Sequence, residues 1–279
     1  GVIINYYIKN LQEDDYIRID IENKDGSLIR TFTNNKDKHS KIENNDVNKM
    51  VGNPVLSNPN DIDNALSSDN LVSLSPRSGG NRLIWDMRYP GFKSFEGMVL
   101  YSSPNVGPKV APGKYNIKMT YNDQIQQKEF EIVKDPRVKI SQADYEDQLE
   151  FLINVRDEVS RANQKIIDIR NIKNNMIFIS EKARDNIELQ EMINNYLTDV
   201  SEIENNIHMT KNQSRQDPLN YGIRINNRIA FLLADSQRGD YPPTDQSKEF
   251  FIQVKGELDS EVMKLDALID KHSQKIENY

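Results

Sequence analysis

Apolar and polar residues alternate through the first half of the chain with the two-residue period of β-strands. Residues 2–8 are β-branched and aromatic, and residues 16–21 alternate strictly, so one face of that strand is apolar and the other polar. Asp25-Gly26 predicts a hairpin turn, because glycine readily adopts the positive φ that a tight turn needs. Further strands are expected at residues 28–32, 81–87, 114–121 and 125–133. A meander of roughly six to eight strands is enough for a two-sheet sandwich.

Beyond Pro136 the hydrophobic period changes to about three and a half residues, which indicates helices. Ser141 and Asp144 have the spacing of a capping box at the start of the first helix. Pro218 is expected in the first turn of a third helix, and Pro242-Pro243-Thr244 precedes a fourth. The four apolar stripes begin at Tyr145, Leu189, Leu219 and Phe251. Four amphipathic helices joined by short polar links should bury these stripes against one another.

One polar pair interrupts the third apolar stripe. Asn226-Asn227 stands between Ile225 and Ile229, where the helical period calls for apolar side chains. A buried amide needs a hydrogen-bond partner, so we interpret the pair as a polar contact between helices.

The two hydrophobic periods together predict an α+β protein with two domains. Residues 1–139 are expected to form an immunoglobulin-like antiparallel β-sandwich, and residues 140–279 an antiparallel four-helix bundle. The polar residues 34–79 are interpreted as a long surface insertion in the sandwich, with at most a short helix near residues 61–66. Because the apolar faces of sheets and helices both need a partner, we expect the two domains to pack on each other.

Composition and charge exclude several classes of function. The 279 residues carry a net charge of -7 without a dense basic run, which argues against nucleic acid as a partner. The chain has no cysteine, so disulfides, thiolate zinc sites and cysteine nucleophiles are excluded. No apolar stretch approaches the roughly 20 residues of a transmembrane segment. The chain starts at Gly1 with neither an initiator methionine nor a signal peptide, so we expect a piece of a longer protein.

Histidine, glycine and acidic motifs give little evidence of chemistry. His39, His208 and His272 have no partner at metal-ligand spacing and are interpreted as solvated or incidental. Gly79-Gly80 precedes a strand and does not lead into a helix, so we expect a hinge and not a phosphate-binding loop. Residues 61–69 resemble a loose calcium loop but lack the glycine and the closing glutamate of an EF-hand. No metal or cofactor is therefore expected.

The sole tryptophan marks the most distinctive candidate site, which comprises Trp85, Asp86 and Arg88. An aromatic ring beside a carboxylate is typical of a sugar-binding platform. The simpler interpretation places Trp85 in the sandwich core, with Asp86 and Arg88 on the opposite face, paired with each other or with loop amides. Exposed tyrosines that are further candidates for an interface are Tyr6, Tyr7 and Tyr101.

A series of motifs along the chain carries a family resemblance. Residues 81–91 read NRLIWDMRYPG, and residues 111–115 read APGKY. Further motifs follow at residues 134–138, 148–152, 217–220, 224–227 and 239–246. In this order they resemble the C-terminal region of bacterial BNR-repeat, sortilin-like β-propeller proteins, whose corresponding signatures are NRFVWDLRYPG and APGTY. Proteins of this family are often labelled glycosyl hydrolases.

The resemblance implies that a β-propeller precedes this region in the parent protein and that any glycosidase-like site belongs to the propeller. The Ser-x-Asp-x-Gly-x-Thr-Trp repeat of such propellers does not occur in this sequence. We therefore expect a non-catalytic accessory region of a secreted or cell-surface bacterial protein, located in the periplasm or on the outer surface. Its expected partner is the N-terminal β-propeller of the same protein or a cell-surface protein complex.

Two other classes of function remain open. A carbohydrate-binding module would use Trp85 or exposed tyrosines to bind a glycan, and it would display a row of aromatic rings on the sandwich. A hydrolase would need two carboxylates about 5–10 Å apart in a cleft, and sequence spacing does not locate such a pair.

Overall fold

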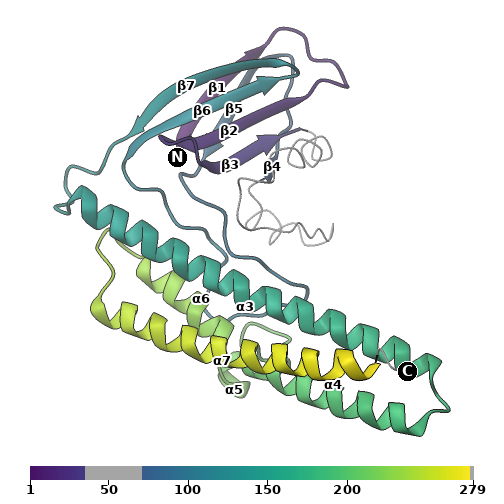
Figure 1. Cartoon of the computed structure of the whole chain (residues 1–279). Coiled ribbons are helices and arrows are strands. Elements are labelled where there is room, and N and C mark those ends of the chain that lie inside the picture. The colour runs from purple at the N-terminus through teal and green to yellow at the C-terminus, as the bar shows by residue number, and fades with distance from the viewer. Residues whose placement is uncertain (35–70, 277–279) are drawn as a thin grey trace. The chain divides into compact units, whose positions relative to one another are not determined.

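The computed structural model describes residues 1–34 and 71–276, and these form an α+β protein with seven strands and five helices (Figure 1). The chain divides into two compact units. The first, here called the sheet unit, comprises Gly1–Gly91 and Asn105–Leu149. The second, the helical unit, comprises Phe92–Pro104 and Glu150–Tyr279.

The sheet unit contains two sheets. Its strands are β1 (Val2–Ile8), β2 (Ile17–Asn23), β3 (Leu28–Thr33), β4 (Leu71–Ser73), β5 (Gly79–Trp85), β6 (Gly113–Tyr121) and β7 (Gln124–Ile132). One sheet has the order β4-β3-β2-β6-β7, with β3 and β4 parallel and the other neighbours antiparallel. The second sheet is the antiparallel pair β1 and β5. The predicted hairpin turn lies between β2 and β3, where Gly26 has a φ of 86°.

Both sheets contribute to one hydrophobic core. Ile4 of β1 and Trp85 of β5 belong to the same buried cluster as Ile19 and Ile21 of β2. The ring of Trp85 meets that of Tyr115 edge-on, with 6.3 Å between the ring centroids. Successive side chains of a strand point to opposite faces, so burial of Ile4 and Trp85 directs their sequence neighbours outward. The core therefore decides which face of the β1–β5 sheet meets solvent.

The segment predicted as an insertion at residues 34–79 contains two pieces of strand. β4 pairs with β3, with Phe32 opposite Val72, and β5 begins at Gly79. β4 is too short to show an alternating pattern, and its pairing depends on a strand far away in sequence. The helix predicted near residues 61–66, the calcium-loop candidate at 61–69 and His39 lie outside the described residues.

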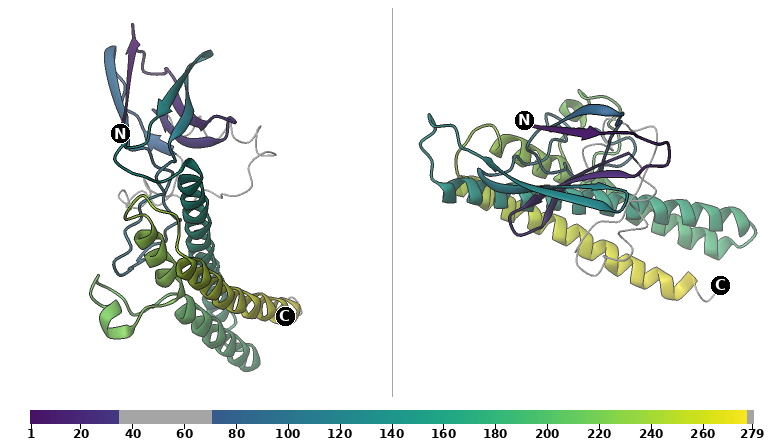
Figure 2. Two further views of the ribbon diagram at one scale, coloured as in Figure 1. Left: turned by 90° about the vertical axis from the view of Figure 1, so that its left-hand side faces the viewer. Right: turned by 90° about the horizontal axis from the view of Figure 1, so that it is seen from above.

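The helical unit contains the helices that the apolar stripes indicated. Their bounds are Gln142–Lys182 (α3), Ile187–Ile207 (α4), Pro218–Tyr221 (α5), Ile225–Ser236 (α6) and Asp245–Ile276 (α7). The first residues of α3 belong to the sheet unit. The predicted capping box is confirmed, since the amide of Ser141 donates to Asp144 Oδ2 over 2.8 Å and the amide of Asp144 donates to Ser141 Oγ over 3.1 Å. Figure 2 shows the long helices from two further sides.

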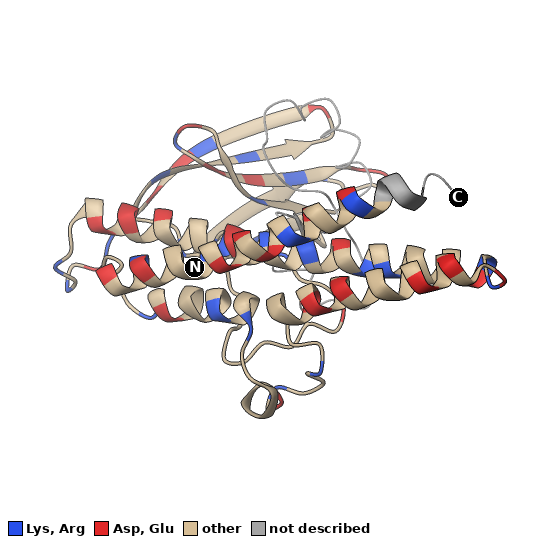
Figure 3. Ribbon diagram, turned by 60° about the horizontal axis from the view of Figure 1, so that its bottom comes forward, with Lys and Arg blue, Asp and Glu red and all other residues tan. Residues whose placement is uncertain are grey.

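The apolar stripes of α3, α4, α6 and α7 are buried together, as predicted. Val155 and Ile166 of α3, Val200 of α4, Ile229 of α6 and Leu258 of α7 are fully buried members of one cluster. Acidic and basic residues are interspersed along the long helices (Figure 3). Among the described residues, no helix has the length and apolarity to cross a membrane.

The third predicted helix is interrupted, which corrects the expectation of one continuous element from Pro218. Gly222 has a φ of 85°, and α5 ends before it while α6 starts at Ile225. A left-handed glycine commonly ends a helix, because other residues adopt this conformation at a cost. The residues of the predicted stripe that precede α6 are accordingly exposed, with Leu219 at 60% and Ile223 at 42%.

Residues 92–104 belong to the helical unit, although the sequence pattern placed them in the first domain. The amide of Lys93 donates to Ser160 Oγ over 3.0 Å, and Asn163 Nδ2 donates to the Lys93 carbonyl over 2.6 Å. Phe92 and Phe95 are buried in the helical core. The segment has neither strand nor helix periodicity, so its attachment to the helices depends on individual side chains.

Candidate functional site

The candidate functional site is the outward face of the β1–β5 sheet. In the strand register Ile3 pairs with Ile84, Asn5 with Arg82 and Tyr7 with Gly80. These six residues, which we call the outward face, alternate with core residues such as Ile4 and Trp85, so all six side-chain positions lie on one side of the sheet.

The outward face displays large side chains to solvent. Ile3 is 57% exposed, Ile84 is 61% exposed and Tyr7 is 73% exposed. Exposed apolar residues are common when they occur singly, but here a cross-strand isoleucine pair and a tyrosine lie on one face, with the Asn5–Arg82 pair between them. This face is therefore a better candidate for binding than any isolated surface residue.

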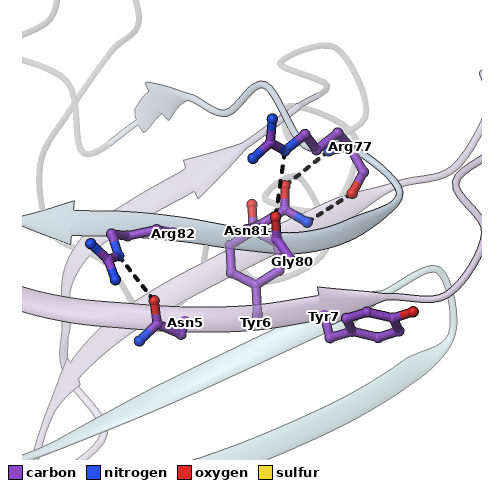
Figure 4. Close-up of a pocket in the computed structure, with 7 residues that line it drawn as sticks. All are labelled: Asn5, Tyr6, Tyr7, Arg77, Gly80, Asn81 and Arg82. Atoms are coloured by element: carbon purple, nitrogen blue, oxygen red, sulfur yellow. Dashed lines mark hydrogen bonds between the residues drawn. The ribbon is translucent and has the colours of Figure 1, made fainter.

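Polar groups occupy the middle and one end of the outward face. Arg82 Nε donates to Asn5 Oδ1 over 3.2 Å, which ties the two strands together through their side chains. A hollow of about 490 Å³ is lined by Asn5, Tyr6, Tyr7, Arg77, Gly80, Asn81 and Arg82 (Figure 4). A Cβ atom at Gly80 would meet no other atom within 4 Å, so this glycine leaves open space on the strand opposite Tyr7.

The turn into β5 is held by the side chain of Asn81. Asn81 Oδ1 accepts from the amide of Arg77 over 2.9 Å, and Asn81 Nδ2 donates to the Arg77 carbonyl over 2.7 Å (Figure 4). Gly79 has a φ of 94°, a conformation in which other residues are strained. The predicted hinge at Gly79-Gly80 is thus a hydrogen-bonded turn that fixes one end of the hollow.

The sequence-predicted residues Trp85, Asp86 and Arg88 lie in a different place from the outward face. Trp85 is only 1% exposed, and its Nε1 donates to the Arg88 carbonyl over 3.1 Å. The amide of Arg88 donates to Asp86 Oδ1 over 3.2 Å, and Arg88 Nη1 donates to the Gly107 carbonyl over 2.8 Å. Trp85 is therefore a core residue, and hydrogen bonds of Asp86 and Arg88 hold the backbone beside it. Its buried ring cannot stack on a sugar.

The interpretation of the histidines as solvated is wrong for the two that the structure describes, because His208 is 2% exposed and His272 is 6% exposed. Nδ1 of His208 lies 3.2 Å from Nδ2 of Asn226, and its ring meets Phe95 edge-on at 4.9 Å between ring centroids. Burial lowers the pKa of His208 to about 4, and the nearby charge of Arg170 acts in the same direction. His208 is therefore a neutral structural residue at pH 7.

The predicted polar contact at Asn226-Asn227 is confirmed. Asn226 Nδ2 donates to Asn163 Oδ1 over 3.1 Å, which joins α6 to α3. Asn227 Oδ1 accepts from the Tyr101 amide over 2.7 Å, and Asn227 Nδ2 donates to the Tyr101 carbonyl over 3.0 Å. Asn227 thereby hydrogen-bonds the backbone of residues 92–104, which pairs with none of the described strands.

A buried ion pair lies beside this amide network. Glu204 Oε1 accepts from Arg170 Nε and Glu204 Oε2 accepts from Lys173 Nζ, each over 2.9 Å. Burial acts to raise the pKa of Glu204, but the hydrogen bonds from Lys173 and Arg170 outweigh it and lower the pKa. Arg170 Nη1 also donates to the Glu96 carbonyl over 2.7 Å, so the ion pair helps hold residues 92–104 on the helices.

Sequence reasoning identified Tyr7 but missed Ile3, Arg82 and Ile84 of the outward face. Each strand showed its own alternation, but the pairing of Ile3 with Ile84 depends on a register between strands far apart in sequence. Within the described ranges, no group of three or more histidine, aspartate or glutamate side chains is placed to hold a metal ion.

Comparisons with protein-family models, with curated proteins and with solved structures find no match to this chain.

Proposed function

We propose that this chain is a non-catalytic accessory region of an exported bacterial β-propeller protein and that it binds the propeller through its outward face. The motif at residues 81–91 supports the assignment to a β-propeller protein, since it resembles the signature of that family. The observation that carries the binding role is the placement of Ile3, Ile84 and Tyr7 on one exposed sheet face.

The chemistry of this face favours a protein surface as the partner. Burial of apolar area contributes about 25 cal/mol per Å², and the Ile3–Ile84 pair offers such area on adjacent strands. Tyrosine and arginine are over-represented among the residues that dominate binding energy at interfaces, and the face presents Tyr7 and Arg82. The hydrogen bond from Arg82 to Asn5 orients the arginine before binding, which lowers the entropy that binding would cost.

Site-specific photo-crosslinking in the full-length protein tests this proposal. A photoreactive amino acid replaces Tyr7 in one variant and Gln127, an exposed residue of β7, in a matched control. We expect cross-linked peptides from position 7 to map to the β-propeller at a much higher yield than those from position 127. Equal yields at both positions, or none to the propeller from position 7, would contradict the proposal.

A second candidate function is carbohydrate binding, which the hollow beside Tyr7 favours. An exposed tyrosine ring with arginine and asparagine side chains around it offers both stacking and hydrogen bonds to a sugar. A glycan array distinguishes the two functions, and carbohydrate binding predicts hits that Tyr7→Ala removes and Ile84→Lys leaves in place. An array without hits would count against this function, whereas protein docking predicts that Ile84→Lys weakens crosslinking from position 7 to the propeller.

We also propose that the sheet unit is an immunoglobulin-like sandwich and that the helical unit is an antiparallel four-helix bundle. The hydrophobic cluster shared by the two sheets supports the first assignment. The burial of apolar stripes from α3, α4, α6 and α7 in one cluster supports the second. The parallel pairing of β3 with β4 is a departure from a fully antiparallel sandwich.

A further inference from the structure

The helical unit contains a groove of about 700 Å³ that the proposed function does not use. It is bordered by the end of α4, the start of α6 and the middle of α7. Its lining residues are Asn206, Ile223, Arg224, Ile225, Arg228, Gln253, Gly256, Glu257, Ser260 and Glu261. The volume lies within the range of small-molecule binding sites.

Arg224 is the unpaired cation of this groove. Its Nε atom is buried and has no hydrogen-bond partner among the described residues, and no ion pair to its guanidinium is formed within them. Protein atoms cover Nε, so an acceptor in the groove would reach the guanidinium through its two terminal nitrogens, which form no hydrogen bond among the described residues. Arg224 is also the N-cap residue of α6, where no side chain caps the helix, so the positive end of the helix dipole adds to its charge.

The remaining charges of the groove are already paired. Arg228 Nη2 donates to Glu257 Oε1 over 3.1 Å, and this hydrogen-bonded pair lowers the pKa of Glu257. Lys264 Nζ donates to Glu261 Oε1 over 2.6 Å, and Asn206 Nδ2 donates to Glu261 Oε2 over 3.2 Å. A glutamate that acts as a general acid needs a raised pKa, so the lowered pKa of Glu257 favours ligand binding over glycoside hydrolysis.

Gly256 is a second, independent indication of a ligand. It lies in the interior of α7, where glycine is about 1 kcal/mol less favourable than alanine. Its φ is not positive, and a Cβ atom placed there would meet no other atom, so neither backbone conformation nor packing requires glycine. What the missing side chain provides is space in the groove, and glycine suits positions where a ligand approaches the backbone closely.

We propose that this groove binds an acidic saccharide, with the carboxylate of the sugar on Arg224. The planar guanidinium matches a carboxylate with two parallel hydrogen bonds. Gln253 and Ser260 offer amide and hydroxyl groups to the hydroxyls of the sugar, and the exposed side chain of Ile223 offers an apolar wall to its C–H groups. Among the described residues Arg224 therefore carries the positive charge of the lining that no ion pair compensates, while Arg228 neutralises Glu257 and Lys264 neutralises Glu261.

Isothermal titration calorimetry of the full chain with a trimer of galacturonic acid tests the proposal. We expect binding of the acidic trimer, and binding at least about ten-fold weaker for a neutral glucose trimer and for acetate, because the charge-assisted pair and the hydroxyl contacts must act together. Binding of acetate or of the neutral trimer as tight as that of the acidic trimer would overturn the proposal, as would no binding of the acidic trimer.

Two substitutions and one control locate the site. Arg224→Gln removes the charge, and Gly256→Leu fills the groove while favouring the helix, so each should weaken binding by about ten-fold or more. Gly256→Leu should unfold at no lower temperature than the parent chain, which separates loss of binding from loss of folding. Arg184→Gln, at an exposed arginine outside the groove, should bind as the parent does. Unchanged binding by both groove variants would overturn the assignment.

Discussion

The sheet unit and the helical unit bury polar groups in different ways. In the sheet unit, buried Asp20 accepts hydrogen bonds from Arg18 on its own strand and from Thr31 on the neighbouring strand, so its partners are local. In the helical unit, Asn163 and Asn227 bond the backbone of residues 92–104, far away in sequence. A sheet satisfies its backbone through the strand ladder, whereas an irregular segment needs side chains to do so. Buried amides in this helical core therefore mark the place where a non-helical segment docks.

Substitution in the apolar core of the sheet unit should cost the most stability. Trp85→Ala should lower the free energy of unfolding by about 3–5 kcal/mol, because the substitution leaves a cavity in the core shared by the two sheets and removes the contacts of the indole ring. Chemical denaturation measures this loss. It is followed by circular dichroism and not by tryptophan fluorescence, because the variant lacks the sole tryptophan. Tyr7→Ala, at an exposed position of the same unit, is the control and should leave stability nearly unchanged. Similar losses for both variants would contradict the assignment of Trp85 as a core anchor.

The second prediction concerns the polar side of the comparison and its dependence on pH. The pKa of His208 is about 4 in the folded chain and has its ordinary value of 6.5 in the unfolded chain. Between these values the unfolded state binds a proton that the folded state excludes. Stability should therefore be complete above pH 6.5 and should fall by about 3 kcal/mol as the pH is lowered to 4.

Denaturation curves at several pH values test this prediction. His208→Gln should flatten the dependence between pH 6.5 and 4, while Glu204→Gln should keep it. The lowered pKa of Glu204 adds a separate loss that begins only below its ordinary value of 4.5. A His208→Gln variant with an unchanged pH profile would show that His208 titrates normally in the folded state.

The third prediction separates buried from exposed ion pairs. Glu204→Gln should destabilise the chain at pH 7 by about 2 kcal/mol, less than for a fully buried pair, because Arg170 and Lys173 remain partly exposed and can regain water. Asp135→Asn removes the exposed pair with Arg137 and should have no measurable effect on thermal unfolding. Equal shifts in melting temperature for the two variants would contradict the structural role of Glu204.

The smallest expected effect tests a purely local feature. Ser141→Ala removes the hydroxyl half of the capping box and should cost about 1 kcal/mol, as is usual for helix N-caps. Denaturant titration measures the change, and Ser141→Thr serves as the control, because threonine keeps the hydroxyl that caps the helix and donates to Asp144. A loss of the same size in both variants would indicate that the hydroxyl acts in some other way.

Features governed by local chemistry were predictable from the sequence. The capping box at Ser141, the hairpin turn at Gly26 and the apolar stripes of the long helices each follow from neighbours within a few residues. The amide pair at Asn226-Asn227 was predictable as well, because a polar interruption of an apolar stripe needs a buried partner. The interruption at Gly222 had a signal, since glycine commonly follows a helix end, but Leu219 and Ile223 on either side continued the stripe.

Local patterns in the sequence were sufficient to predict an α+β chain, Trp85 as a candidate core residue and the positions of most strands and helices. Contacts between distant elements were needed to place Ile3 beside Ile84, to attach residues 92–104 to the helices and to bring Arg224 and Gly256 into one groove. The physical reason is that periodicity records which face of an element is apolar, whereas the pairing of distant elements depends on register and on individual hydrogen bonds.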